Sequence, residues 1–180
     1  MTVGGRELEL RACVPSDVRE IAEIYAHAVL HGTASFELSA PDSEEMARRQ
    51  QDLLSRGYPY FVAVSGREVL GYAYAGPYRT RPAYRHTVED SVYVRPDAQR
   101  RGVGLALLQR LVQEAESRGF RQMVAVIGDS ANRGSIRLHE CVGFAHIGVL
   151  HSVGWKHGRW LDSVFMQREL GPGATSSPGN

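Results

Sequence analysis

The chain has 180 residues, about the length of one domain, and its content of 43% hydrophobic and 23% charged residues is that of an ordinary globular protein. Its formal net charge of +1 gives no reason to expect nucleic acid or an acidic membrane surface as a partner. The two cysteines form no metal-binding or disulfide pattern, and the sequence contains neither a membrane-spanning run nor a secretory signal, so we expect a cytoplasmic protein without a metal.

The first third of the chain predicts one strand and two helices after a loose start at residues 1–5. Asp17 and Glu20 are spaced as a capping box at the start of the first helix, and Gly57 stops the second helix. Residues 34–37 between the helices are predicted to be a loop. The strand is expected over residues 8–13 and the helices over residues 15–31 and 42–55.

The middle third predicts three strands. The first two are joined by Ser65-Gly66-Arg67-Glu68, which indicates a hairpin, and a loop with Pro77 and Pro82 leads to the third. The strands are expected over residues 60–64, 69–75 and 87–94.

A turn with two glycines follows the third strand. Gly102 and Gly104 are two residues apart, so the backbone can pass close to a ligand without a Cβ in the way. A long amphipathic helix begins there and points its unpaired N–H groups at the turn, where Arg100 and Arg101 add charged donors. The third glycine of a dinucleotide fingerprint and the Gly-Lys-Ser/Thr of a P-loop are missing. The turn therefore predicts a pyrophosphate site of another kind.

The last third predicts alternating helices and strands. Met123–Ile127 is almost wholly apolar, which is typical of a strand buried on both faces. The two last strands flank a loop at residues 154–158, and the Gly-, Pro- and Ser-rich residues 171–180 are expected to be a disordered tail. The helices are expected over residues 102–118 and 133–142. We therefore expect one α/β (α+β) domain over residues 1–170 with a mostly antiparallel sheet.

Several short motifs, in this order along the chain, resemble the GNAT superfamily of N-acetyltransferases. They are Gln99-x-x-Gly102-x-Gly104, Asn132-x-x-Ser135 and Leu138-His139-Glu140-x-x-Gly143-Phe144. The closer resemblance is to phosphinothricin-type acetyltransferases, through Thr87-Val88-Glu89, Ala125-Val126-Ile127-Gly128 and the segment Lys156–Asp162. The resemblance implies a single mixed sheet of about seven strands flanked by about four helices.

The resemblance also implies acetyl-CoA as co-substrate. Its pyrophosphate would lie on the glycine turn, and its pantetheine arm would pair along the edge of the strand that ends at Val94. The residues assigned to this cofactor are Val92, Tyr93, Val94, Arg100, Arg101, Gly102, Val103, Gly104, Leu105, Asn132 and Ser135.

Glu89 is the first candidate for catalysis, as the general base that takes a proton from the attacking amine. It stands in a strand among apolar neighbours, where burial raises the pKa of a carboxyl group. Alternation along the strand places Glu89 with Ser91 and Tyr93 on one face and Asp90 on the other, unless a bulge shifts the count. The alternative is a structural carboxylate that pairs with an arginine.

His139 is the second catalytic candidate. Asn132, Ser135 and His139 are spaced at i, i+3 and i+7, so a helix presents all three on one side. His139 could protonate the leaving thiolate, assist the base or only pack, and the sequence leaves these three roles open.

The substrate is expected to contact the loop before the Glu89 strand. Arg79 and Arg81 carry guanidinium groups that suit a carboxylate or a phosphinate, and the resemblance implies substrate-binding roles for both, for Tyr84 and for Glu89. It also implies that Phe36 forms a pocket wall. The alternative for the arginines is a solvated basic loop.

Two tryptophans, Trp155 and Trp160, lie in the last hairpin. Aromatic residues of this kind commonly anchor an interface, and we expect a homodimer.

We therefore expect an enzyme that acetylates the α-amino group of a small amino acid or analogue, such as phosphinothricin, methionine sulfoximine or methionine sulfone, by direct attack on acetyl-CoA. Two alternatives stay open. One is an acetyltransferase for protein N-termini or polyamines, of which the polyamine is disfavoured by Arg79 and Arg81. The other is a sensor that binds acyl-CoA without turnover.

Overall fold

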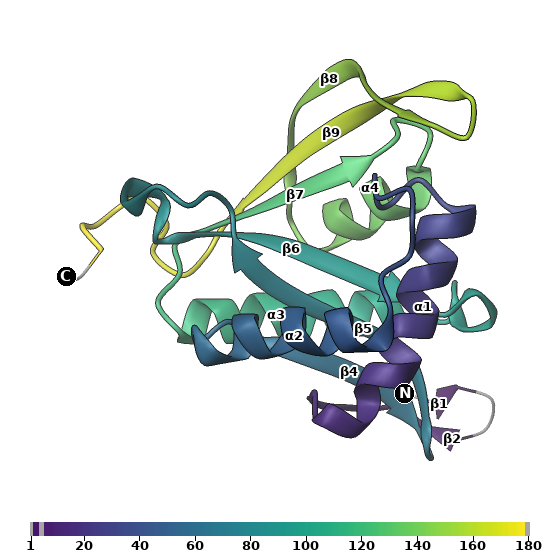
Figure 1. Ribbon diagram of the computed structural model, residues 1–180. Coiled ribbons are helices and arrows are strands. Elements are labelled where there is room, and N and C mark those ends of the chain that lie inside the picture. Colours follow the sequence, from purple (N-terminus) through teal and green to yellow (C-terminus); the bar gives the residue numbers. More distant parts are fainter. Residues whose placement is uncertain (1, 4–5, 179–180) are drawn as a thin grey trace.

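The computed structural model describes residues 2–3 and 6–178, which form one seven-stranded sheet with helices on both faces (Figure 1). The strands of this sheet are β3 (Glu9–Ala12), β4 (Tyr60–Ser65), β5 (Glu68–Pro77), β6 (Thr87–Val94), β7 (Gln122–Gly128), β8 (Ala145–Lys156) and β9 (Arg159–Glu169). The helices are α1 (Val18–His31), α2 (Ser43–Ser55), α3 (Val103–Ser117) and α4 (Arg133–Cys141), with short 3-10 turns η1 (Pro15–Asp17), η2 (Pro82–Tyr84) and η3 (Pro96–Ala98). The expected class, a single mixed α/β domain, is confirmed.

The order of strands in the sheet is β3-β4-β5-β6-β7-β9-β8. Neighbouring strands of the described sheet are antiparallel except β6 and β7, which run parallel. This parallel pairing covers only Thr87–Glu89 opposite Gln122–Val124, and beyond it the two strands diverge (Figure 1). The divergence leaves the second half of β6 without a neighbour on its β7 side.

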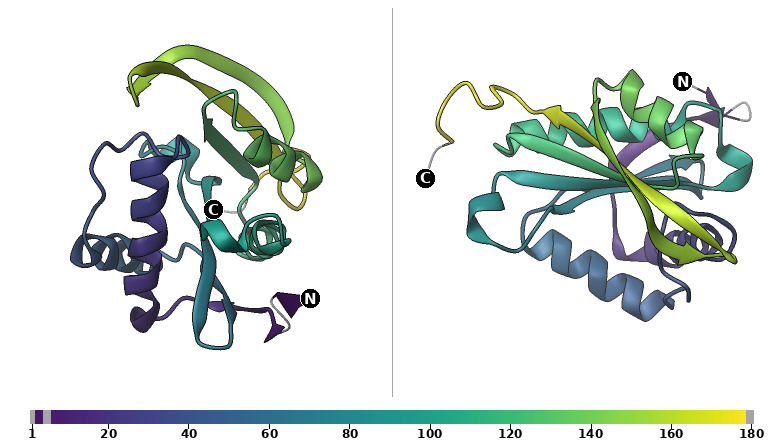
Figure 2. Two further views of the ribbon diagram at one scale, coloured as in Figure 1. Left: turned by 90° about the vertical axis from the view of Figure 1, so that its right-hand side faces the viewer. Right: turned by 90° about the horizontal axis from the view of Figure 1, so that it is seen from above.

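Each face of the sheet carries its own apolar core. Helices α1 and α2 cover one face, and α3 and α4 lie on the other (Figure 2). The buried side chains of α3 recur at helical spacing and form a single stripe toward the sheet. They are Val103, Leu107, Leu108, Leu111, Val112 and Ala115. In the part of the chain that the structure describes, no helix is both long and apolar enough to cross a membrane.

Two expectations about the N-terminal region are wrong. Thr2–Val3 (β1) pairs with Arg6–Glu7 (β2) where a loose start was expected, and Met1, Gly4 and Gly5 lie outside the described residues. The capping box does not form either. The Asp17 carboxylate binds the Arg11 guanidinium and the Val14 N–H, and the Glu20 carboxylate accepts the N–H of Val69 across the sheet. Asp17 has thus found other partners nearby in the chain, whereas Glu20 binds a distant strand.

The last hairpin is longer than expected. β8 continues to Lys156, so the predicted loop at residues 154–158 reduces to a two-residue turn at His157 and Gly158. Both turn residues have positive φ, 52° and 72°, which suits the twist of a tight hairpin.

The described part of the C-terminal tail, residues 171–178, forms turns next to the body of the protein. The Arg121 guanidinium donates to the carbonyls of Gly173 and Ser177. Gly179 and Asn180 lie outside the described residues, and disorder of the tail stays a prediction.

Candidate active site

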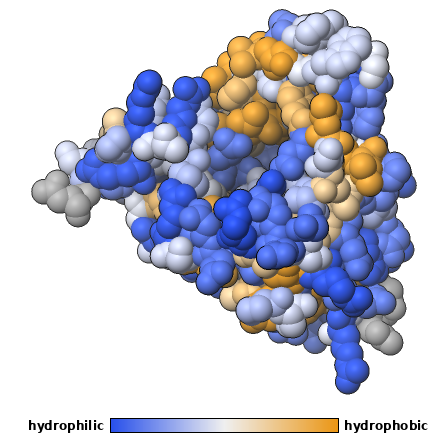
Figure 3. Space-filling view, viewed as in Figure 1, coloured by the Kyte–Doolittle hydropathy of each residue, from blue (hydrophilic) through white to orange (hydrophobic). Residues whose placement is uncertain are grey.

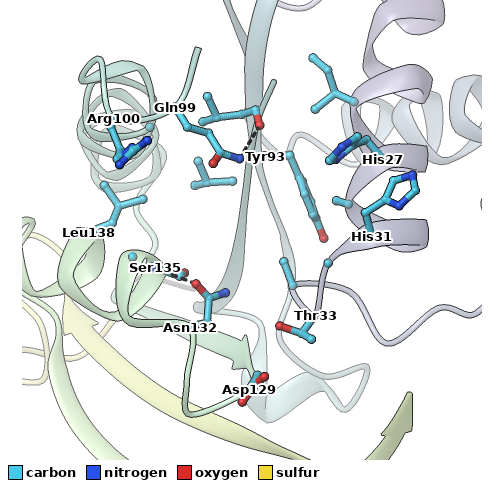
Figure 4. Close-up of a pocket in the computed structure, with 18 of the residues that line it drawn as sticks. His27, His31, Thr33, Tyr93, Gln99, Arg100, Asp129, Asn132, Ser135 and Leu138 are labelled. Atoms are coloured by element: carbon cyan, nitrogen blue, oxygen red, sulfur yellow. Dashed lines mark hydrogen bonds between the residues drawn. The ribbon is translucent and has the colours of Figure 1, made fainter. Parts of the chain in front are cut away.

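A cavity of about 790 Å³ opens where β6 and β7 diverge, a volume in the range of small-molecule and cofactor sites. α1 forms one wall, and the glycine turn and α4 form the opposite wall (Figure 4). The β6 edge at Val92–Val94 lies between these walls. The remaining polar lining residues are His27, His31, Thr33, Gln99, Arg100, Asp129, Asn132, Ser135 and Arg159.

The glycine turn presents backbone to this cavity. Arg100 and Gly102 have positive φ, 58° and 80°, and among the described residues no side chain caps the N-terminus of α3. Consecutive N–H groups in such a turn form an anion-binding concavity at the positive end of the helix dipole. Gly102, Gly104, Leu105 and the Arg100 side chain line the cavity, as predicted. Val103 is buried in the core and Arg101 lies outside the lining, so the structure does not bring those two side chains to it.

A second cavity of about 240 Å³ continues from the first, with which it shares Ala34, Val92, Tyr93, Asn132 and Ser135. Its lining is mostly polar, and the strands β6 and β7 supply most of the residues. Its other lining residues are Ser35, Tyr74, Glu89, Asp90, Ser91, Ala125, Val126, Ile127, Gly128 and His139. Seen from the side of Figure 1, the molecular surface is hollowed below the β8–β9 hairpin, with hydrophobic side chains above a hydrophilic floor (Figure 3).

Glu89 lies in the second cavity, at the last position where β6 pairs with β7. Burial, with a smaller contribution from the neighbouring Asp90 carboxylate, raises the pKa of Glu89 to about 7. Within residues 2–3 and 6–178, no ion pair involves Glu89, so the arginine-paired alternative is not what the structure shows. A carboxyl group with this pKa can accept a proton near neutral pH.

The two neighbours Glu89 and Asp90 face opposite sides of the sheet. β6 pairs with β5 in an unbroken register from Val88 to Val94, so no bulge shifts the alternation. Tyr93 packs on the α1 side, where its ring meets that of Tyr25 edge to face at 5.0 Å. Glu89 shares that side, and Asp90 shares the side of α3 and α4 with the buried Val88.

His139 meets Asp90 beneath the second cavity. Its Nε2 atom lies 3.0 Å from Asp90 Oδ2, and its Nδ1 atom lies 2.7 Å from the Ser135 carbonyl oxygen. Burial lowers the pKa of His139, but the hydrogen bond and charge of Asp90 outweigh it and raise the pKa above its ordinary value. Asn132 caps α4 by accepting the Ser135 N–H, so the helix presents Asn132, Ser135 and His139 together, as the spacing predicts.

Of the residues expected to bind substrate, Glu89 lines the second cavity, whereas Arg79, Arg81 and Tyr84 lie outside both cavities. Arg79 stacks over the rings of Tyr78 and Tyr84, at 5.2 and 5.8 Å from their centres, and Arg81 is exposed. Their loop begins directly after Pro77, which pairs with Val88 beside Glu89. The loop therefore starts at the end of β6 that carries Glu89.

Phe36 also lies behind the cavity wall. Its ring occupies the space that a side chain would need at Gly128 and Gly154, and this contact holds the α1–α2 loop on the ends of β7 and β8. Ala34 and Ser35 line the cavity in its place. The Lys156 ammonium donates to the Ser35 carbonyl at 2.6 Å and secures the same loop.

Several lining residues were missed from the sequence. His27 and His31 on α1 line the large cavity, and their i, i+4 spacing on the otherwise apolar second half of the helix was the available signal (Figure 4). Tyr74 enters the second cavity from β5, because its partner in the ladder is Ser91 of β6. Arg159 pairs with Asp129 at the mouth of the large cavity, a contact across 30 residues that no local pattern signals.

Comparison with known proteins gives a consistent result. The Acetyltransferase (GNAT) family model matches residues 20–144. The chain is 50% identical to a phosphinothricin N-acetyltransferase of Alcaligenes faecalis, over 97% of this chain and 91% of that protein. It is 41% identical to an L-methionine sulfoximine/L-methionine sulfone acetyltransferase of Salmonella typhimurium, over 91% and 95% of the two chains. A crystal structure of a Sinorhizobium meliloti phosphinothricin acetyltransferase in complex with AcCoA superposes with a TM-score of 0.93 at 48% identity, covering 96% of this chain and 94% of that one.

Proposed function

This chain belongs to the acetyltransferase (GNAT) family, and from that premise we propose that it transfers the acetyl group of acetyl-CoA to the α-amino group of a small amino acid or amino-acid analogue. Phosphinothricin and methionine sulfoximine, which appear in the names of its relatives, are the analogues to test first. The position of Glu89 carries this proposal, because a carboxyl group with a pKa of about 7 lies in the smaller, polar cavity, which shares part of its lining with the cofactor-sized one.

The residues of the large cavity fit acetyl-CoA. The N–H groups of the turn at Gly102 and the Arg100 guanidinium suit a pyrophosphate, and the β6 edge at Val92–Val94 offers unpaired backbone groups to the amides of a pantetheine arm. When bound, acetyl-CoA supplies the activated acetyl group at the end of this edge.

Residues of the chain perform the remaining chemistry. The Glu89 carboxylate takes the proton that the amine must lose as it attacks. Backbone N–H groups on the free edge of β6 donate to the thioester carbonyl oxygen, which gains negative charge during attack. Since the amine attacks directly, no covalent intermediate forms on the enzyme.

The acceptor is recognised by side chains next to the second cavity. The guanidinium groups of Arg79 and Arg81 suit a carboxylate or phosphinate of a molecule in the second cavity, and Tyr84 and Phe36 support the segments next to it. The stacking of Arg79 on two tyrosine rings limits the orientations of its guanidinium plane.

We also propose that the protein is a cytoplasmic homodimer. β8 is an edge strand of the sheet, and it and the adjacent β9 expose large apolar side chains. They are Ile147, Leu150, Val153, Trp155 and Trp160. A second copy of the same surface would cover this patch with a symmetric contact.

Release of the CoA thiol, measured with the purified protein and acetyl-CoA, tests the proposed reaction. The acceptors are phosphinothricin, methionine sulfoximine, methionine sulfone, free amino acids, a polyamine and a short peptide. Turnover with the amino-acid analogues alone supports the proposal. Turnover with only the peptide or the polyamine contradicts the acceptor class, and bound acetyl-CoA without turnover indicates a sensor.

A further inference from the structure

The contact between Asp90 and His139 joins two parts of the chain that are 49 residues apart. Asp90 is the first β6 residue beyond the pairing with β7, and His139 lies in the last turn of α4. The side chains are 2% and 5% exposed, and the His139 ring also meets the Phe144 ring edge to face at 5.0 Å. The contact therefore spans, inside the protein, the gap where the two strands diverge.

The hydrogen bonds define how many protons this pair holds. The Ser135 carbonyl can only accept, so His139 Nδ1 carries a hydrogen. An ionised Asp90 carboxylate also only accepts, so a second proton must lie between Oδ2 and Nε2. Asp90 Oδ1 is buried with no hydrogen-bond partner among the described residues. An adjacent positive charge is then the main interaction that offsets the cost of burying the carboxylate.

We propose that Asp90 is a positioning residue that holds His139 as an imidazolium ion and thereby fixes α4 against β6 at the acetyl-transfer end of the cavity. Both ring nitrogens are occupied in this arrangement, by Asp90 and by Ser135. His139 is then not a direct proton donor to the leaving sulfur, one of the three roles that the sequence left open.

The parts that this pair holds form the wall shared by the two cavities. Asn132 and Ser135 lie at the start of α4, at least one helical turn before His139. Both residues line the large cavity and the second cavity. Their distance from the β6 edge is set at the other end of α4 by the Asp90–His139 contact, because β6 and β7 no longer pair there. The effect on kcat rests on the proposed acetyl transfer, whereas the charge of the His139 ring does not.

The first test is spectroscopic and needs no turnover. ¹⁵N NMR of the full chain should show both nitrogens of His139 protonated across neutral pH. The other titratable side chains in the lining of the second cavity are those of Tyr74, Glu89 and Tyr93, of which Glu89 and Tyr93 point to the opposite face of β6 from Asp90. In Asp90→Asn the amide can donate to Nε2, so we expect a neutral ring that keeps its hydrogen on Nδ1. A neutral His139 in the unaltered chain overturns the proposal.

The second test compares Asp90→Ala with Asp90→Asn. Loss of the contact in Asp90→Ala should lower kcat by about 10- to 100-fold, the scale on which displacement of groups around a reaction acts, with little change in acetyl-CoA affinity. Asp90→Asn keeps a hydrogen bond and should restore most of kcat.

Asp17→Ala is the matched control, since it removes a buried carboxylate bound to Arg11 and the Val14 N–H, remote from the site. It should lower Tm without changing kcat. If Asp90→Ala behaves like Asp17→Ala, Asp90 is only structural and the proposal is wrong. If the unaltered chain acetylates no amine, the proposed function fails, and the NMR spectrum alone decides on the Asp90–His139 pair.

Discussion

Adjacent residues of β6 have opposite environments. Glu89 points to the side of α1 and α2 and reaches the second cavity without an ion-pair partner among the described residues, whereas Asp90 is held by His139 on the other side. The same two-residue alternation that directs Glu89 into the cavity therefore buries Asp90 against His139. The Asp90 charge remains close enough to contribute to the raised pKa of Glu89.

Substitution of Glu89 by Gln should lower kcat by about 10²- to 10⁴-fold, the usual contribution of a general base. The unaltered enzyme should lose kcat/KM as pH falls below about 7, because a protonated Glu89 cannot accept the amine proton. Initial rates from pH 5.5 to 9 check both expectations. Glu68→Gln, at an exposed glutamate of β5, is the control, and an unchanged acid limb in Glu89→Gln would assign that limb to another group.

Replacement of Arg79 or Arg81 by Ala should raise KM for an anionic acceptor by about tenfold while the KM for acetyl-CoA stays the same, since a charged hydrogen bond contributes about 1.5–3 kcal/mol. Arg85→Ala, an exposed arginine of the same loop, serves as the control. Equal effects of all three substitutions would mean that the loop acts through its overall charge.

At the level of elements, the site depends on where pairing stops. β6 is paired with β5 along its whole length but with β7 only through Glu89, so backbone that a regular sheet would use is free for a ligand. α3 then begins with a left-handed glycine and no side-chain cap among the described residues, which leaves its first N–H groups available at the same place. One strand and one helix terminus thus leave backbone groups unpaired at the large cavity, where we propose that the cofactor binds.

Glycine at the two ends of α3 offers a matched comparison. Gly102 and Gly119 have nearly the same positive φ, 80° and 83°, so Ala at either position should cost about 1 kcal/mol of stability, or ~2–4 °C in Tm. Only Gly102→Ala should also weaken acetyl-CoA binding, by at least about tenfold, because its strain displaces the anion-binding turn. Calorimetric titration with acetyl-CoA distinguishes the two, and equal affinities would remove the turn from the cofactor site.

At the level of the whole molecule, helices cover both faces of the sheet, and β8 forms one of its edges. The turn of the β8–β9 hairpin is hydrogen-bonded to the α1–α2 loop. Lys156 binds the Ser35 carbonyl, and His157 binds the Gly32 carbonyl. The two tryptophans that flank this turn pack on each other edge to face at 5.2 Å and stay more than half exposed. A partner on this surface would therefore contact the element that holds one wall of the cavity.

Replacement of Trp155 and Trp160 by Glu should convert a dimer into single chains of 19.9 kDa, because it places charge in the middle of the apolar patch. Light scattering coupled to size-exclusion chromatography measures the mass. Leu54→Glu, at a partly exposed apolar residue of α2, should leave the dimer intact. A monomeric unaltered protein at micromolar concentration would refute the proposed homodimer.

The sequence by itself determined the features that depend on local spacing. The helical stripe of α3, the paired β-rich runs of β4 and β5 and the glycine turn at Gly102 all appear in the structure as predicted, since each follows from periodicity or from the backbone conformation of a few neighbouring residues. The position of Glu89 on its strand followed from the same alternation.

The tertiary structure alone decided the features that depend on distant partners. The pairing of β6 with β7 ends at Glu89, His139 meets Asp90, and Glu20 binds Val69 instead of capping its own helix. Each of these features depends on segments that are remote in sequence. Arg79 packs on tyrosine rings and Phe36 packs on Gly128 and Gly154, so neither side chain lines a cavity. Local pattern sets the conformation of a segment, whereas burial and long-range hydrogen bonds determine what each side chain faces.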